Sequence, residues 1–218
     1  ELAKAAEPLF ERQQEIADTL ELPARFEGKI RDLSRWSLVR LLYCPNRDVG
    51  HEAITAIESH ATTTDFGPVL TAVLRDRRHP YRRIAHWNVL DLFEDMPSFC
   101  KSTAEQSQAV VAIRDLMWDA SDDFARAVFK AGGVLGGHIC TDEAADALFE
   151  CLKAPSRIGR RSAIHAVFHL AEWLPARKAD VLLGLRWSAE HDPEPLLRSF
   201  ASAMARDVSE LLPELVAA

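Results

Sequence analysis

The stretch that decides the fold reads RRSAIHAV and spans residues 160–167. On a helix, Arg160 and Ala163 are three positions apart and therefore share one face. The small Ala163 lets a neighbouring helix approach closely, and the apolar residues three or four positions further on fill the shared core. The stretch follows a break at Pro155-Ser156, because proline is tolerated in the first turn of a helix. It therefore predicts a helix that packs tightly against its neighbours.

The same spacing recurs along the chain. The matching pairs are Arg82 with Ala85, Arg126 with Phe129, Arg198 with Ala201, and Gly50 with Ala53, where glycine replaces the arginine. The second residues of successive pairs lie 32 to 44 residues apart along the chain, which is typical of helical repeat arrays. One helix pair cannot bury its apolar face by itself, so the recurrence predicts pairs that stack.

The rest of the sequence also favours helices. Apolar residues recur at helical spacing, as at Val69, Val73 and Leu74, and strand-like alternation is absent from the sequence. Pro, Asp and Ser interrupt this pattern and mark the ends of helices. The predicted breaks are Pro45-Asn46, His79-Pro80, Ser121-Asp122, Pro155-Ser156 and Asp192-Pro193. The predicted fold class is all-α.

These segments resemble the HEAT-repeat family, in which each unit has an outer helix, a tight turn often containing Asp-Pro, and an inner helix opening with Val-Arg-x-x-Ala. The resemblance covers residues 31–208, and Phe129 departs from it, since a small residue is usual there. It implies a right-handed α-α solenoid of about five helix pairs forming a single domain over residues 1–218. Residues 1–30, with a helix over about Pro8–Leu20, and residues 209–218, with Leu211–Val216, are the expected caps.

Composition narrows the class of protein. The chain has 218 residues, a net charge of −7, 48% hydrophobic and 27% charged residues, as in an ordinary globular protein. No apolar run reaches the length of about 20 residues that spans a membrane, so we expect no membrane association. The four cysteines form no C-x-x-C pair, which predicts free thiols in a reducing cytoplasm. The acidic balance makes nucleic acid an unfavoured partner.

Arginines gather near the predicted turns, at residues 75–83 and 157–161. Several would lie at the positive end of a helix dipole, where a cation costs about 0.3–1 kcal/mol. Carboxylates in adjacent repeats could compensate them, namely Asp48, Asp76, Asp122 and Asp192. We favour this ladder of ion pairs, and an anion or phosphate site is the alternative.

The face beside the core stripe of the inner helices holds the candidate binding residues. In two repeats this face carries Arg83, Trp87, Leu90 and Glu94, and Arg161, His165, Phe168 and Glu172, with His169 close by. Inner helices line the concave surface of a solenoid, where such proteins bind their partners. The predicted binding site is Arg83, Trp87, Arg161, His165 and His169, because arginine and aromatic residues dominate binding interfaces. The alternative is that Trp87 and His165 pack between repeats.

Two further patterns favour structural interpretations. His165, His169 and Glu172 could face one metal ion, but they lack the His-Glu-x-x-His arrangement and a distant ligand, so we predict no metal and no cofactor. The glycines at 132, 133, 136 and 137 are not preceded by a strand, so they do not form a phosphate loop. We expect close helix approach or a helix end there, with Gly136 or Gly137 closing the helix.

The functional prediction is a non-enzymatic protein-binding scaffold, regulator or inhibitor that uses the concave face. The alternative is an enzyme resembling the helical-repeat DNA glycosylases for alkylated bases, with Trp87, Asp91, Trp118 and Asp119 as candidate residues. A weaker possibility is a role like that of the related repeat lyases that attach bilin pigments. Fold does not determine function, so the sequence leaves these options, the partner and the oligomeric state open.

Overall fold

The computed structural model describes residues 30–118 and 125–210. Every regular element in these ranges is helical and no strand occurs among them, so the all-α prediction is confirmed. The chain divides into two compact units. Unit 1 comprises residues 1–112 and 124–130, and unit 2 comprises residues 113–123 and 131–218. The predicted cap helices at about Pro8–Leu20 and Leu211–Val216 lie outside the described residues.

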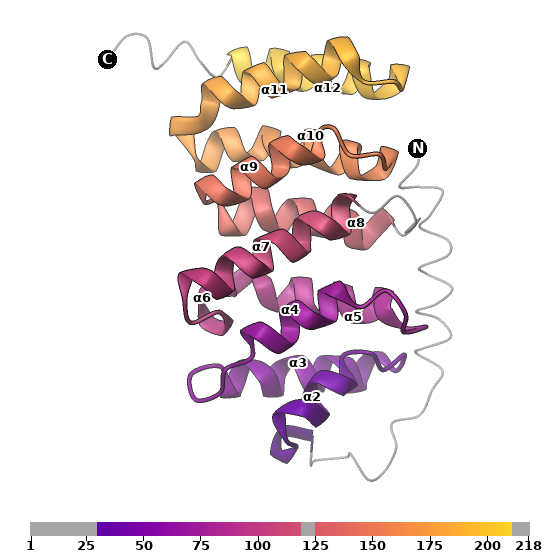
Figure 1. Cartoon of the computed structure of the whole chain (residues 1–218), viewed down its shortest axis with the longest axis vertical. Helices are drawn as coiled ribbons and strands as arrows, with labels where there is room; N and C mark the ends of the chain where they lie inside the picture. The colour runs from indigo at the N-terminus through magenta and orange to yellow at the C-terminus, as the bar shows by residue number, and fades with distance from the viewer. Residues whose placement is uncertain (1–29, 119–124, 211–218) are drawn as a thin grey trace. The chain divides into compact units, whose positions relative to one another are not determined.

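Unit 1 consists of paired helices (Figure 1). Its elements are η1 (Ile30–Asp32), α2 (Arg35–Leu41), α3 (Arg47–His60), α4 (Gly67–Arg75), α5 (Arg82–Leu92), η2 (Phe93–Asp95), α6 (Met96–Phe99) and the first parts of α7 (Thr103–Trp118) and α8 (Ala125–Gly133). Helix α2 packs against α3, α4 packs against α5, and α3 also contacts α5. The Asn46 side chain begins α3 by accepting the backbone N–H groups of Asp48 and Val49 at 2.9 and 3.2 Å.

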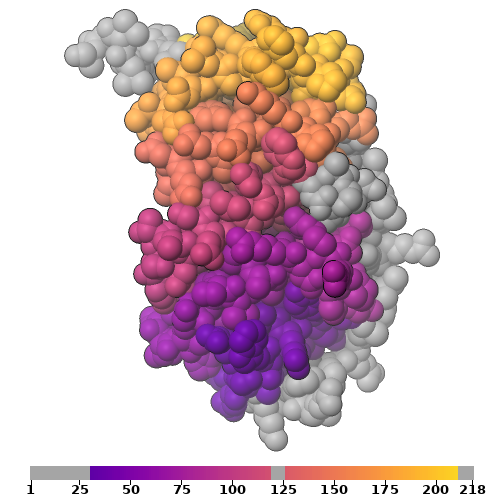
Figure 2. Space-filling model, in the orientation of Figure 1, coloured from indigo at the N-terminus to yellow at the C-terminus, as the bar shows by residue number. Residues whose placement is uncertain are grey.

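Unit 2 repeats this pairing with longer helices (Figure 1). It contains the ends of α7 and α8, η3 (Val134–Ile139), α9 (Asp142–Cys151), α10 (Arg157–Trp173), η4 (Pro175–Arg177), α11 (Lys178–His191) and α12 (Pro195–Glu210). Helix α9 packs against α10, α11 packs against α12, and α10 also contacts α12. In the space-filling view the orange and yellow atoms of this unit form one continuous packed body (Figure 2).

The helix ends and the buried repeat positions agree in most places with those predicted from the sequence. Four of the five breaks fall between helices, and Ser121-Asp122 lies outside the described residues. The alanines of the repeat pattern are fully buried, with an exposed fraction of 0%: Ala53, Ala85, Ala163 and Ala201. Phe129 is only half-buried, whereas the preceding Ala127 and Val128 are buried, so the third segment departs from the pattern.

One rung of the predicted ladder of ion pairs is present in the core of unit 2. Arg160 Nε donates to Asp192 Oδ2 at 2.8 Å, and Nη2 donates to Oδ1 at 3.3 Å. Both side chains are buried, with exposed fractions of 8% and 0%. Arg160 lies in the first turn of α10 and Asp192 in the turn before α12, so the pair joins consecutive helix pairs as predicted.

The glycine run forms a close contact between helices, as predicted, but it does not end the helix. A Cβ atom at Gly132 or Gly136 would lie 2.3 Å from Ser162 Oγ or 2.5 Å from Ala166 O on α10. The prediction that Gly136 or Gly137 closes the helix is wrong. The chain continues as the π-helix η3 and ends at Cys140, whose φ of 48° is left-handed. The wider π turn carries the backbone past Gly136 while that residue keeps its contact with α10.

Candidate functional site

An aromatic and charged cluster joins α5 and α8 in unit 1. Trp87 on α5 is half-buried, and two cations of α8 lie over its ring. Lys130 Nζ is 4.5 Å and Arg126 Cζ is 5.5 Å from the ring centroid. Such cation–π contacts contribute about 0.5–2 kcal/mol, depending on desolvation. Trp87 therefore makes strong aromatic contacts within the chain.

Acidic residues of α5 and η2 complete this cluster. Lys130 forms ion pairs with Asp91 and with Glu94, the latter at 3.0 Å between Nζ and Oε1, and its side chain is only 12% exposed. Arg83, the other predicted site residue of α5, is half-buried in the first turn. The prediction that Leu90 shares this open face is wrong, because Leu90 is fully buried. The apolar stripe of α5 is therefore wider than the sequence register predicted.

A second cluster lies on α10 and α12 in unit 2. Arg161, His165 and His169 follow one another at intervals of four residues on α10 and therefore share one side of that helix. Phe200 of α12 contacts two of them: Arg161 Cζ lies 5.6 Å from its ring centroid, and the His165 ring stacks on it at 6.5 Å and 24°. We call these four residues the α10–α12 surface.

The two histidines of this surface are in direct contact. Their Nε2 atoms are 3.3 Å apart, and their rings are nearly perpendicular, with centroids 4.6 Å apart and an interplanar angle of 89°. Glu172 Oε2 lies 3.7 Å from the opposite nitrogen of His169, Nδ1. Phe168 packs its ring edge-on against His169 at 5.3 Å. Neighbouring residues thus hold both imidazoles in defined orientations.

Electrostatics favour the neutral form of the first of these histidines. Partial burial lowers the pKa of His165, and the positive charges of His169 and Arg161 lower it further. The imidazole is therefore neutral at physiological pH and can accept a hydrogen bond or donate a lone pair.

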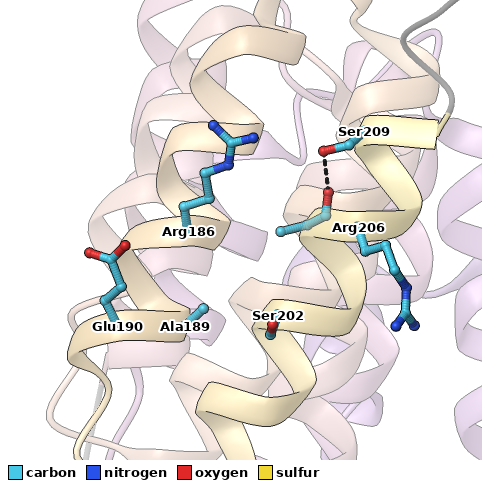
Figure 3. A pocket seen from close by; sticks show the side chains of 7 residues that line it. Arg186, Ala189, Glu190, Ser202, Arg206 and Ser209 are labelled. Atoms are coloured by element: carbon cyan, nitrogen blue, oxygen red, sulfur yellow. Dashed lines mark hydrogen bonds between the residues drawn. The ribbon is translucent and has the colours of Figure 1, made fainter.

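A shallow groove runs between α11 and α12 in the same unit (Figure 3). It has a volume of about 480 Å³ and is lined by Arg186 and Glu190 of α11 and by Ser202, Arg206 and Ser209 of α12; the Glu190 and Arg206 side chains extend away from the opposite helix. Ser209 Oγ donates to Ala205 O at 2.7 Å and so bonds within its own helix. The charged lining residues, Arg186, Glu190 and Arg206, are all exposed, and no buried polar group marks a binding position in the groove.

The four cysteines are free thiols, as predicted, and three of them are poor nucleophiles. Burial raises the pKa of Cys100 and of Cys151 to about 12, and it also raises the pKa of Cys140. Since the thiolate is the reactive form, these side chains offer little covalent chemistry at neutral pH.

The residues of the glycosylase alternative are partly brought together. Trp87 and Asp91 lie one turn apart on α5 and both contact Lys130 in unit 1. Trp118 is 40% exposed at the end of α7 in unit 2, and Asp119 lies outside the described residues. Within the described ranges, no group of three or more His, Cys, Asp or Glu side chains could hold a metal ion. No described helix is both long enough and apolar enough to cross a membrane.

Two contributors to these clusters were not predicted as site residues. Lys130 and Phe200 reach the candidate residues from other helices, α8 and α12. The sequence position of Lys130 gives no sign of this, because its contacts depend on how α5 and α8 pack. Phe200 lies two positions after the repeat arginine Arg198, whereas the predicted face begins one position after each repeat arginine. A face that was one residue wider would have included Phe200.

Comparison of the chain with protein-family models, with curated proteins and with solved structures returned no match.

Proposed function

We propose that the chain is a HEAT-like helical-repeat protein of about five helix pairs. The same pairing inside each unit supports this: α3 contacts α5 in unit 1, and α10 contacts α12 in unit 2, each next to its own partner helix. The buried repeat alanines and the Arg160–Asp192 pair between consecutive helix pairs support it as well. In such an array the second helices of successive pairs form one continuous binding face.

We infer that this protein is a non-enzymatic binding module for another protein, acting through the α10–α12 surface. The observation that carries this proposal is the cluster of Arg161, His165, His169 and Phe200, held in place by contacts across two helices. Arginine and aromatic side chains contribute most to protein interfaces when they are prepositioned. The free thiols fit a reducing compartment, and we place the module in the cytoplasm.

The second candidate is an alkylated-base DNA glycosylase-like enzyme. It is favoured by Trp87 next to Asp91, with the cations of Arg126 and Lys130 close by in unit 1. It ranks second because the net charge of −7 opposes binding to the phosphate backbone. Moreover, the Asp91 carboxylate is already paired with Lys130, which would have to move before Asp91 could act on a substrate.

The test is affinity purification from the native cell, with and without nuclease, using three forms of the full chain. These are the wild type, an Arg161→Ala/His165→Ala variant, and Arg186→Ala as a control on an exposed part of α11. We expect a protein that co-purifies after nuclease treatment with the wild type and the control but is lost with the double variant. Circular dichroism should show that all three forms are equally helical.

Two outcomes would reject the proposal. The first is a partner whose recovery is the same with the double variant as with the wild type, since the α10–α12 surface would then not be the interface. The second is recovery that disappears with nuclease, which would favour the nucleic-acid alternative.

A further inference from the structure

Contrary to the expectation from the sequence, which predicted no metal here, we propose that His165 and His169 form a binding site for one divalent transition-metal ion, with Zn²⁺ as the expected ligand. The site uses the Nε2 atoms of both imidazoles, one turn apart on α10. This inference goes beyond the proposed protein-binding function and requires no partner protein.

The distance between the two nitrogens is the first argument. Tetrahedral zinc binds imidazole at about 2.0–2.1 Å, so two nitrogens on one ion lie about 3.3–3.4 Å apart. The two Nε2 atoms are 3.3 Å apart. The same separation also allows a hydrogen bond between the two rings, which a bound ion would replace. The pair is spaced as two ligands of one ion would be.

The surroundings of the rings are the second argument. Glu172 Oε2 faces Nδ1 of His169, at 3.7 Å, on the side of the ring opposite to Nε2. Metal-binding histidines usually direct their other nitrogen to such a carboxylate, and at 3.7 Å the Glu172 carboxylate makes an electrostatic contact with His169 rather than a hydrogen bond. Phe200 stacks on the His165 ring, and Phe168 packs against His169. Little rearrangement is therefore needed before an ion can bind.

The donor set selects the class of ion. Imidazole nitrogen suits Zn²⁺, Cu²⁺ and Ni²⁺, whereas Mg²⁺ and Ca²⁺ prefer oxygen ligands. Arg161, one turn before His165 on α10, opposes a bound cation, while the Glu172 carboxylate favours one. No third protein ligand completes the site among the described residues, so water or a donor from another molecule fills the remaining positions. We therefore expect affinity in the micromolar range and an exchangeable ion.

The test is isothermal titration calorimetry of the full chain with zinc chloride in a buffer that does not chelate metals. Four forms are compared: the wild type, His165→Gln, His169→Gln, and His51→Gln as a control at an exposed histidine on α3. The wild type and the control should bind one equivalent with the same micromolar dissociation constant. Each of the other two variants should bind about tenfold more weakly or worse, because either change removes one of two ligands.

A second measurement on the unmodified chain guards against misfolded variants. The chain has eight histidines. Paramagnetic Ni²⁺ should broaden the NMR resonances of the His165 and His169 rings at lower concentrations than those of the six others. The proposal is overturned if zinc fails to saturate the wild type below millimolar concentration or if both histidine variants bind like the wild type. It is equally overturned if other histidines broaden first. These results are independent of whether a partner protein is found.

Discussion

Replacing Arg160 by alanine should strongly destabilise unit 2. Its guanidinium makes two bonds to Asp192, at 2.8 and 3.3 Å, and Nη1 donates to the carbonyl oxygens of Ala154 and Pro155 at 2.9 and 3.1 Å. The substitution removes all four bonds at a position where the arginine side chain is only 8% exposed. It therefore leaves a buried carboxylate and two carbonyl groups without these partners.

The expected loss follows from the burial of Asp192, whose side chain is 0% exposed. Removing one partner of a buried ion pair costs about 3–5 kcal/mol, because the remaining charge stays away from water. Asp192 Oδ1 still accepts the Glu194 backbone N–H at 2.8 Å, which moderates the loss. The two carbonyl groups add a smaller penalty, since an unmet hydrogen bond costs about 1–3 kcal/mol. We expect Arg160→Ala to lower the free energy of unfolding by about 4 kcal/mol.

The assay is urea-induced unfolding followed by far-UV circular dichroism. Arg160→Ala, Asp192→Ala and the double variant form a thermodynamic cycle, and the double variant should lose about 2 kcal/mol less than the sum of the single variants. Arg198→Ala is the matched control, because Arg198 is the equivalent residue of the next repeat. It donates to the backbone oxygen of Asp192 at 2.7 Å from a half-buried position, so we expect a loss of about 1 kcal/mol.

Two results would refute this reasoning. One is a loss below about 1 kcal/mol for Arg160→Ala, which would mean that water reaches Asp192 as it reaches a surface residue. The other is strict additivity of the two single variants, since residues that share a buried ion pair cannot act independently.

Three further predictions concern packing and pH. Gly136→Ala should destabilise the protein by about 1–3 kcal/mol, because the added Cβ would lie 2.5 Å from a backbone oxygen. A Cβ at Gly137 would meet nothing within 4 Å, so Gly137→Ala should be neutral or slightly stabilising. Equal shifts in melting temperature for the two variants would contradict this. Ala163→Phe should cost about 1–3 kcal/mol in urea unfolding, and a neutral effect would show that the repeat register is wrong. Although burial acts to raise it, the pKa of Asp76 is lowered by hydrogen bonds from two backbone amides and the Tyr43 hydroxyl. The ionised Asp76 carboxylate therefore stabilises the folded state fully above the ordinary aspartate pKa, and this stabilisation is lost as the pH falls through the lowered pKa. The difference in melting temperature between the wild type and Asp76→Ala should therefore shrink in acid. A difference that does not depend on pH would exclude this.

Much of the fold could be predicted because its signals are local. Helical periodicity, proline and capping residues act within a few positions of each other, so breaks such as Pro45-Asn46 and Asp192-Pro193 coincide with real helix ends. Burial of the repeat alanines could also be predicted, since a small residue at a fixed place in each repeat marks a close helix contact. Arg160 and Asp192 carry opposite charges at adjacent turns, so their pairing could be anticipated from spacing as well.

The end of η3 and much of the candidate site could not be predicted in this way. The sequence offers four similar glycines, and only the position of α10 separates Gly132 and Gly136 from the other two. The helix ends at none of these glycines but at Cys140, whose left-handed conformation glycine would adopt more easily. The sequence gives no signal for an end at this residue. Likewise, the spacing of His165 and His169 is visible in the sequence, but the stacking of Phe200 on His165 depends on contacts between helices.

The two adjacent arginines at the start of α10 have different roles, one in the stability of the fold and one in the proposed binding surface. Neighbouring residues on a helix point about 100° apart, so Arg160 and Arg161 cannot serve the same face. Arg160 turns into the core towards Asp192, and Arg161 turns towards Phe200 on the α10–α12 surface. A substitution at Arg160 should therefore change stability first, and one at Arg161 should change binding first. Any loss of binding in an Arg160 variant follows from the fold, and only Arg161 variants that keep their stability test the surface.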